Sequence, residues 1–166
     1  MMGRTHLVGG FLSSALALNH FQMITELRNV EFLLFAGTSI IGSLIADVDH
    51  KKSTIGKSMP WFSNFLQKTV GHRTLTHSII SVLFLVFVTF IVQRLENEAI
   101  FIMLFGLTVG HISHIVLDCL THNGVSLLYP ISKKRYKLPL TIRTGSYAEK
   151  VLTCAMIIYT VSLLVQ

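Results

Sequence analysis

The sequence predicts an all-α, polytopic membrane bundle of about five helices, and composition is the first observation that predicts it. Of the 166 residues, 51% are hydrophobic and only 13% are charged, against roughly 25% charged in an average soluble domain. The mean hydropathy is +0.62, which excludes an ordinary soluble domain and a disordered chain. The apolar residues also form continuous runs, whereas the strands of a membrane β-barrel alternate. We therefore interpret residues 1–166 as a single membrane-embedded domain.

Five apolar runs define the expected helices. They cover residues 7–21, 30–46, 78–92, 99–120 and 151–165. A crossing helix needs about 20 predominantly apolar residues, with a lower limit near 17. The second and fourth runs meet this length directly. The first, third and fifth are expected to cross only if their polar flanks lie among the headgroups or the bilayer thins locally.

The distribution of basic residues predicts the orientation of the bundle. The connections at residues 47–76 and 121–148 are long and rich in Lys and Arg. If all five runs cross, every Lys and Arg except Arg28 and Arg94 lies on the side that also holds the N-terminus. An excess of Lys and Arg marks the cytoplasmic side. The sequence thus predicts a multi-pass protein of the cell membrane with its N-terminus in the cytoplasm and its C-terminus outside.

Histidine and acidic side chains gather at the expected cytoplasmic ends of these helices. The chain has eight His and only three Asp, and each Asp lies within four positions of a His. His20 is at the opposite end. The candidates for chemistry are His6, Asp47, Asp49, His50, His72, His77, His111, His114, Asp118 and Glu149.

The fourth run carries the most specific part of this set. On a helix that turns about 100° per residue, His111, His114 and Asp118 fall within an arc of about 60°. Ionisable groups inside a membrane span are costly and normally face a partner in the bundle interior. Imidazole nitrogen and carboxylate oxygen without thiolate suit Zn²⁺, with Mn²⁺ or iron as alternatives. The number of candidates indicates two or three ions, or one ion with a complete outer shell; Cys119 and Cys154 are expected to be packing residues.

A series of motifs then indicates a family. The chain has THxxxG at residues 5–10, DxDH at 47–50, GHRxxTHS at 71–78, GxxxHxxxD at 110–118, TxxG at 121–124, LP at 138–139 and GxxxE at 145–149. This ordered set resembles the LexA-binding, inner-membrane-associated hydrolase family (YdjM-like). The resemblance implies a metal-dependent hydrolase that is distantly related to zinc-dependent phospholipase C. It also implies the ligands His6, Asp47, His50, His72, His77, His114, Asp118 and Glu149.

The favoured function is hydrolysis of a phosphoester in a lipid or another amphiphilic substrate by metal-activated water. Asp49 or Glu149 would be the general base. The groups expected to hold an anionic headgroup are Arg73, Lys133, Arg135 and Arg143. One alternative is a regulatory scaffold with a structural metal. Another is a metal transporter, which the scarcity of polar residues in the far halves of the helices disfavours. The partners expected are membrane lipids and not nucleic acid, because the sequence has no helix-turn-helix or basic module interleaved with aromatic residues.

Overall fold

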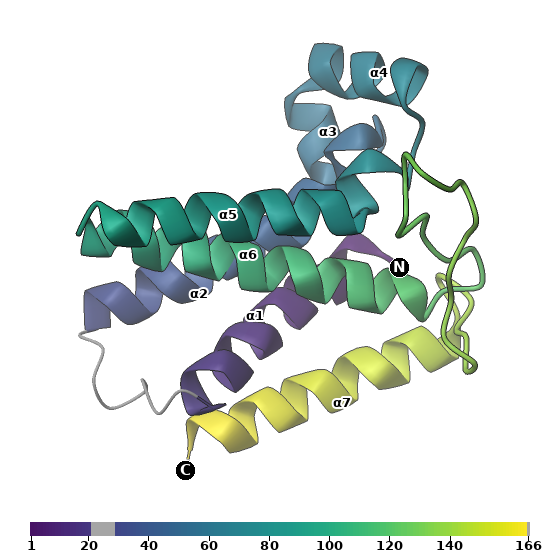
Figure 1. Ribbon diagram of the computed structural model, residues 1–166. Coiled ribbons are helices and arrows are strands. Elements are labelled where there is room, and N and C mark those ends of the chain that lie inside the picture. The colour runs from purple at the N-terminus through teal and green to yellow at the C-terminus, as the bar shows by residue number, and fades with distance from the viewer. Residues whose placement is uncertain (21–28, 166) are drawn as a thin grey trace.

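The computed structural model describes residues 1–20 and 29–165, and these residues confirm the all-α prediction (Figure 1). They form seven α-helices and no strand, with two isolated β-bridges in the connection before the last helix. The five long helices are α1 (Gly3–His20), α2 (Asn29–Ile45), α5 (Ile79–Arg94), α6 (Glu98–Cys119) and α7 (Tyr147–Leu164). The connection after α2 contains the short helices η1 (Ala46–Asp49), α3 (Thr54–Ser58), α4 (Pro60–Thr69) and η2 (Leu75–His77), of which the apolar pattern gave no sign.

Within residues 1–20 and 29–165, three segments are long and apolar enough to cross a membrane. They are Asn29–Asp49, Glu98–Cys119 and Tyr147–Leu164. The second and fourth runs are thereby confirmed as possible spans. The fifth also qualifies, because its helix begins at Tyr147, ahead of the apolar run, and reaches 18 residues. The apolar helix α5 has 16 residues, and α1 has the length but is less apolar, so the crossing of these two helices stays a prediction.

Three of the long helices begin at a residue that caps them. The hydroxyl of Ser78 accepts the Ser81 amide at the start of α5, and the hydroxyl of Ser146 accepts the Glu149 amide at the start of α7. The side-chain oxygen of Asn97 does the same for α6. Each cap satisfies one of the amides that the first turn of a helix leaves unpaired. The caps fix where α5 and α7 leave the polar connections near the candidate residues.

The centre of the bundle is a close pair formed by α2 and α6. A Cβ atom at Gly110 would collide with the carbonyl oxygen of Ser39, and one at Gly42 would collide with the carbonyl oxygen of Leu107. Glycines at such positions let two membrane helices approach backbone to backbone. Helix α1 packs against both members of the pair, α5 packs against α6, and α7 packs chiefly on α1. The close pair brings the end of α2 beside the last turns of α6.

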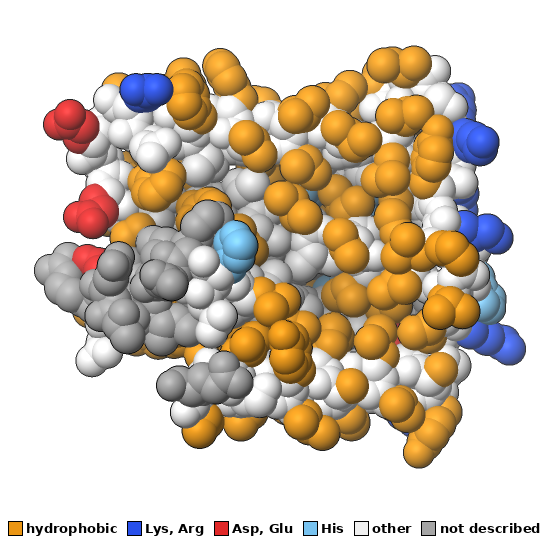
Figure 2. Space-filling model, turned by 60° about the horizontal axis from the view of Figure 1, so that its bottom comes forward, with side chains coloured by type: hydrophobic (Ala, Val, Ile, Leu, Met, Phe, Trp, Pro, Cys, Tyr) orange, Lys and Arg blue, Asp and Glu red, His pale blue; other side chains and the backbone are white. Residues whose placement is uncertain are grey.

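The two ends of the bundle differ in composition. In Figure 1 the N-terminus, α3, α4 and the connection between α6 and α7 all lie at the same end of the long helices. On the face drawn in Figure 2, most Lys and Arg side chains line that end, and hydrophobic side chains cover the surface between the two ends. Large apolar side chains such as Phe84 and Phe87 on α5 are exposed. This pattern fits an apolar belt in contact with lipid.

Candidate metal centre

Seven candidate residues lie together at the basic end of the bundle. In the described part of the chain they form three groups in which one ligand atom from each residue lies within 4.8 Å of the others. The groups are His6, His114 and Asp118; Asp47, His77 and His114; and Asp47, Asp49 and His72. His114 belongs to the first two groups and Asp47 to the last two. The groups are therefore continuous, as expected for a centre that binds more than one cation.

Four separate segments supply these residues. His6 lies in the second turn of α1, and Asp47 and Asp49 lie in η1, where the apolar run of α2 ends. His72 and His77 lie in the connection just before α5. His114 and Asp118 are one turn apart on α6 and are fully buried. The site thus depends on the bundle as a whole, because no segment carries a complete ligand group.

The imidazole of His114 is fixed by a backbone acceptor. Its Nδ1 lies 2.5 Å from the carbonyl oxygen of Ser43 and must donate to it. In the neutral imidazole the Nε2 atom then carries no hydrogen; it lies 3.1 Å from Nε2 of His77 and 3.7 Å from Oδ1 of Asp47. Metal-binding histidines are commonly oriented through the opposite ring nitrogen in this way.

His77 is held in the same manner. Its Nδ1 lies 2.9 Å from Oγ1 of Thr76 and 3.5 Å from Oδ2 of Asp49. Its Nε2 lies 3.7 Å from carboxylate oxygens of both Asp47 and Asp118. Burial alone would lower the pKa of His77, but the carboxylates of Asp47 and Asp49 outweigh it and raise the pKa to about 9. The carboxylates of Asp47 and Asp118 therefore favour a positive charge between Nε2 of His77 and Nε2 of His114.

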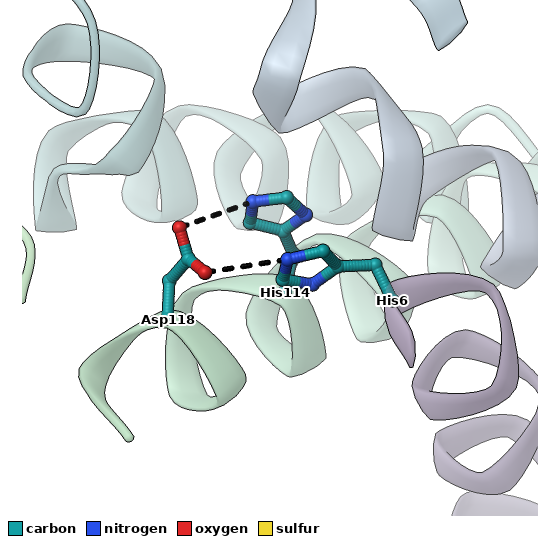
Figure 3. A group of neighbouring side chains, drawn as sticks. All are labelled: His6, His114 and Asp118. Carbon is teal, nitrogen blue, oxygen red and sulfur yellow. Dashed lines mark ion pairs between the residues drawn. The ribbon is translucent and has the colours of Figure 1, made fainter. Parts of the chain in front are cut away.

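His6 completes the first group, which Figure 3 shows. Its ring stacks on that of His114 with centroids 3.7 Å apart, and its Nε2 lies 3.3 Å from Oδ1 of Asp118. Neither ring nitrogen of His6 has a hydrogen-bond partner of acceptable geometry among the described residues, although both are buried. Buried polar atoms without partners are rare and need an explanation such as an unseen ion.

The donor set fits Zn²⁺ in chemistry and spacing. Zn–N bonds of about 2.05 Å at a tetrahedral angle place two nitrogen ligands about 3.3 Å apart, close to the 3.1 Å between the Nε2 atoms of His77 and His114. Carboxylate oxygens of Asp47 and Asp118 lie within 4 Å of the same nitrogens. The residues present can therefore hold a divalent cation with only small side-chain movements.

Asp49, expected as a general base, is engaged by three donors. Its Oδ1 lies 2.7 Å from Nδ1 of His72, and its Oδ2 accepts the Arg73 amide at 3.0 Å and the hydroxyl of Thr76 at 2.7 Å. These contacts hold residues 72–76 against η1. Asp49 thus orients His72 and also belongs to the third ligand group, and its role as a base stays a prediction.

Glu149, expected as a ligand or base, lies outside the three groups found in the described chain. Its Oε1 accepts the amide of Met2 at 2.6 Å and the hydroxyl of Thr5 at 2.8 Å. Its Oε2 accepts the amide of Gly145 at 2.6 Å. The buried carboxylate thereby joins the start of α7 to the start of α1, and its role as a ligand or base stays a prediction.

Two expected histidine ligands also lie outside the three groups. Nε2 of His111 lies 2.9 Å from the hydroxyl of Ser81 on α5, one turn deeper in the bundle than His114. The ring of His50 lies 4.6 Å from that of His72 and lines a polar cavity of about 220 Å³ together with Asp47. Burial and the neighbouring His72 lower the pKa of His50 below its usual value.

The four basic residues expected at a headgroup site are separated. Arg73 is buried, and its Nη2 lies 2.8 Å from Oδ2 of Asp118 while its Nη1 donates to the hydroxyl of Thr121 at 3.1 Å. The other three, Lys133, Arg135 and Arg143, are exposed on the connection between α6 and α7. Of the expected set, Arg73 is the residue whose contacts place it at the centre.

Comparison with known proteins decides the family. The sequence matches the family described as "YdjM inner membrane protein" over residues 1–166. The chain belongs to this family. It is 34% identical over 156 residues to the uncharacterized protein YvsG of Bacillus subtilis (strain 168), a match that covers 94% of this chain and 89% of YvsG. It is also 34% identical over 126 residues to the inner membrane protein YdjM of Escherichia coli (strain K12), covering 75% of this chain and 63% of that protein. No solved structure matches.

Membership of the YdjM family and the three possible spans together make this chain an inner membrane protein. Within this YdjM-family chain, the structure adds supporting residues that the analysis of the sequence did not single out. Thr76 donates to Asp49, Thr121 accepts from Arg73, and the carbonyl of Ser43 orients His114. The two threonines lie inside the GHRxxTHS and TxxG motifs, which was an available signal. The carbonyl of Ser43 gave none, because a backbone acceptor is independent of the side chain.

Proposed function

We propose that this YdjM-family protein is a membrane-embedded, metal-dependent hydrolase that cleaves a phosphoester in a lipid or another amphiphilic substrate. The observation that carries the proposal is the sharing of His114 and Asp47 between adjacent ligand groups. A structural metal site is normally closed and needs only four ligands, whereas linked sites are typical of enzymes that act on phosphoesters. Zn²⁺ suits the donors best, and Mn²⁺ or iron is the alternative.

A bound divalent cation would lower the pKa of a water ligand and withdraw charge from a phosphoryl oxygen. The chain supplies the remaining functions. Arg73 is buried against Asp118, and its Nε has no hydrogen-bond partner among the described residues, so it can hold a phosphoryl oxygen. The polar cavity beside Asp47 gives water and a headgroup access to the centre.

The base that accepts the proton of the attacking water is assigned to His50. Asp49 and Glu149 each accept three hydrogen bonds, which stabilise the ionised carboxylate and make it a weaker base. Burial and the neighbouring His72 lower the pKa of His50, which favours its neutral imidazole, the form that can accept a proton. It lines the polar cavity with Asp47, which places it beside the expected path of water.

The position of the centre favours a lipid substrate over a soluble one. The ligand groups lie at the ends of α2 and α6, where the apolar belt meets the basic connections. The phosphoester of a membrane lipid lies at the boundary between headgroups and acyl chains, which is the same depth in the bilayer as the ligand groups. Lys and Arg at this end would attract anionic headgroups.

The test is hydrolysis by the purified protein in phospholipid vesicles with Zn²⁺ or Mn²⁺. We expect release of phosphate or a headgroup, its loss in His114→Ala and its retention in His122→Ala, because His122 is exposed and outside the ligand groups. Absence of hydrolysis on a broad lipid panel, with metal bound to the wild type, would reject the enzyme and support a structural metal in a scaffold protein.

A further inference from the structure

An apolar groove of about 350 Å³ lies between α1, α6 and α7. Its size is within the roughly 300–1,000 Å³ of ligand sites in proteins. Side chains that define its walls are Leu12 and Leu16 of α1, Val109 and Val116 of α6, and Met156 of α7. The groove exists because α7 packs chiefly on α1 and leaves space beside α6.

The two serines in the groove do not make it polar. The hydroxyl of Ser13 donates to the carbonyl of Gly10 at 2.9 Å, and the hydroxyl of Ser113 donates to the carbonyl of Gly110 at 2.8 Å. Both hydroxyls are thus satisfied within their own helices. The groove offers its occupant dispersion contacts, and a polar ligand would lose its hydrogen bonds to water on entering.

The groove lies at the depth of the bilayer interior. Residues 109–117 belong to the possible span Glu98–Cys119, and Met156 belongs to the possible span Tyr147–Leu164. At this depth the surrounding solvent is lipid hydrocarbon and not water. An apolar groove in that position is accessible from the side to an acyl chain.

One end of the groove is close to the metal centre. Leu117, which lines the groove, directly precedes Asp118 and packs with Met156 and Met1 in one apolar cluster. Met1 also lines the polar cavity that contains Asp47. Met1 therefore lies between the apolar groove and the polar cavity.

We infer that the groove between α1, α6 and α7 binds one acyl chain of a membrane phospholipid whose headgroup occupies the polar cavity. The position of the headgroup in this inference rests on the proposed function. The position of the acyl chain rests on the groove alone. The inference defines the substrate as a lipid that enters sideways from the bilayer. The phosphoester of such a lipid lies between the groove and the cavity, near Met1, Asp47 and Asp118.

A second apolar hollow provides an internal comparison. It has a volume of about 280 Å³ on the other side of α1 and is lined by residues that include Phe11, Ile40 and Ile157. It does not include Leu117 or Met156. A lipid that merely coats the protein would label both hollows, whereas a bound substrate chain would label the groove preferentially.

The experiment uses vesicles that contain phosphatidic acid with a photoreactive diazirine in one acyl chain. After irradiation, mass spectrometry locates the label on the wild type, on Ser113→Phe and on Leu16→Trp, which fill the groove from opposite walls. Ser162→Phe is the matched control, because Ser162 is exposed on α7 and does not line the groove. We expect label on the groove residues of the wild type and the control. We expect about tenfold less label on the groove residues in the two filling variants. The new aromatic side chain occupies the space of the acyl chain, and forcing both into the groove costs energy; tenfold weaker binding corresponds to about 1.4 kcal/mol.

Metal content and hydrolysis measured on the same samples separate this inference from the proposed function. Groove labelling without any hydrolysis would support the acyl-chain site and would reject the proposed hydrolase function. Equal labelling of both hollows, undiminished labelling in both filling variants, or a cross-link from the groove to a second copy of the chain would overturn the inference. Loss of groove labelling in the two filling variants, with their bound metal retained, would support the inference.

Discussion

The Nε2 atoms of His77 and His114 face each other at 3.1 Å across 37 positions of sequence. His114 belongs to a possible span, and His77 belongs to the connection that precedes α5. Each ring is oriented through its other nitrogen, by the carbonyl of Ser43 for His114 and by Thr76 and Asp49 for His77. Two imidazoles directed at one point and surrounded by carboxylates form a cation site. A proton on a ring nitrogen competes with the cation for this site.

Removing His114 should remove the metal. His114→Ala deletes the residue shared by two ligand groups, and we expect the zinc affinity of the purified protein to fall about 100-fold or more. His111→Ala, one turn away, loses only the contact with Ser81 and should keep its zinc. Elemental analysis after dialysis measures both. An equal loss in the two variants would show that the helix, and not the ligand, had been disturbed.

Binding of the cation should release a proton. The pKa of His77 is raised to about 9, so at pH 7 its imidazole carries a proton that a cation at Nε2 must displace. The apparent affinity for zinc should therefore rise with pH up to about 9 and then level off. Calorimetry at pH 7 in buffers of different ionisation enthalpy should report release of about one proton per cation. A binding enthalpy that is independent of the buffer would contradict this assignment.

Much of the fold and part of the centre could be predicted from the sequence, and the exceptions have physical causes. The apolar runs located the five long helices, and angular spacing placed His111, His114 and Asp118 on one face of α6. The angular position of a residue around the helix, however, does not say how far along the helix axis it lies from the metal centre. His111 lies about 4.5 Å farther along the axis than His114, where its neighbour is Ser81 and not a carboxylate.

The roles of the carboxylates could not be predicted because they depend on how the connections fold. Asp47 and Asp49 are two positions apart, yet Asp47 belongs to two ligand groups, while Asp49 belongs to one and also accepts three hydrogen bonds from the connection. Glu149 opens α7 at the same end of the bundle, but its partners are the first residues of α1. Only the packed structure distinguishes a ligand from a residue that holds the backbone in place.

Neutralising Asp49 should weaken metal binding without removing a shared ligand. Asp49→Asn retains the volume but loses the charge and one of the acceptor oxygens that hold Arg73 and Thr76. We expect a loss of about 10–100-fold in zinc affinity. Hydrogen exchange should also accelerate at the amide of Arg73, which Asp49 accepts. Unchanged affinity together with unchanged exchange would remove Asp49 from the centre.

Glu149→Gln should affect stability and spare the metal. The buried carboxylate accepts three hydrogen bonds that join α7 to α1, and replacing a charged acceptor of this kind costs about 1.5–3 kcal/mol. We expect a lower unfolding temperature in detergent and an unchanged zinc content. Ser162→Ala, which removes an exposed hydroxyl that donates to the Tyr159 carbonyl of its own helix, is the control and should change little. A loss of zinc in Glu149→Gln would return this residue to the ligand set.

The metal centre should face the cytoplasm. An excess of Lys and Arg marks the cytoplasmic side, and these residues lie at the end of the bundle that holds the ligand groups (Figure 2). In a variant without Cys119 and Cys154, Lys134→Cys should react with an impermeant maleimide only in inverted vesicles. Glu96→Cys, in the turn between α5 and α6, should react only in intact cells. If all five long helices cross, a reporter enzyme fused after residue 166 should be active outside the cytoplasm. A reporter on the same side as Lys134→Cys would mean that α7, the long helix between these two positions, does not cross the membrane.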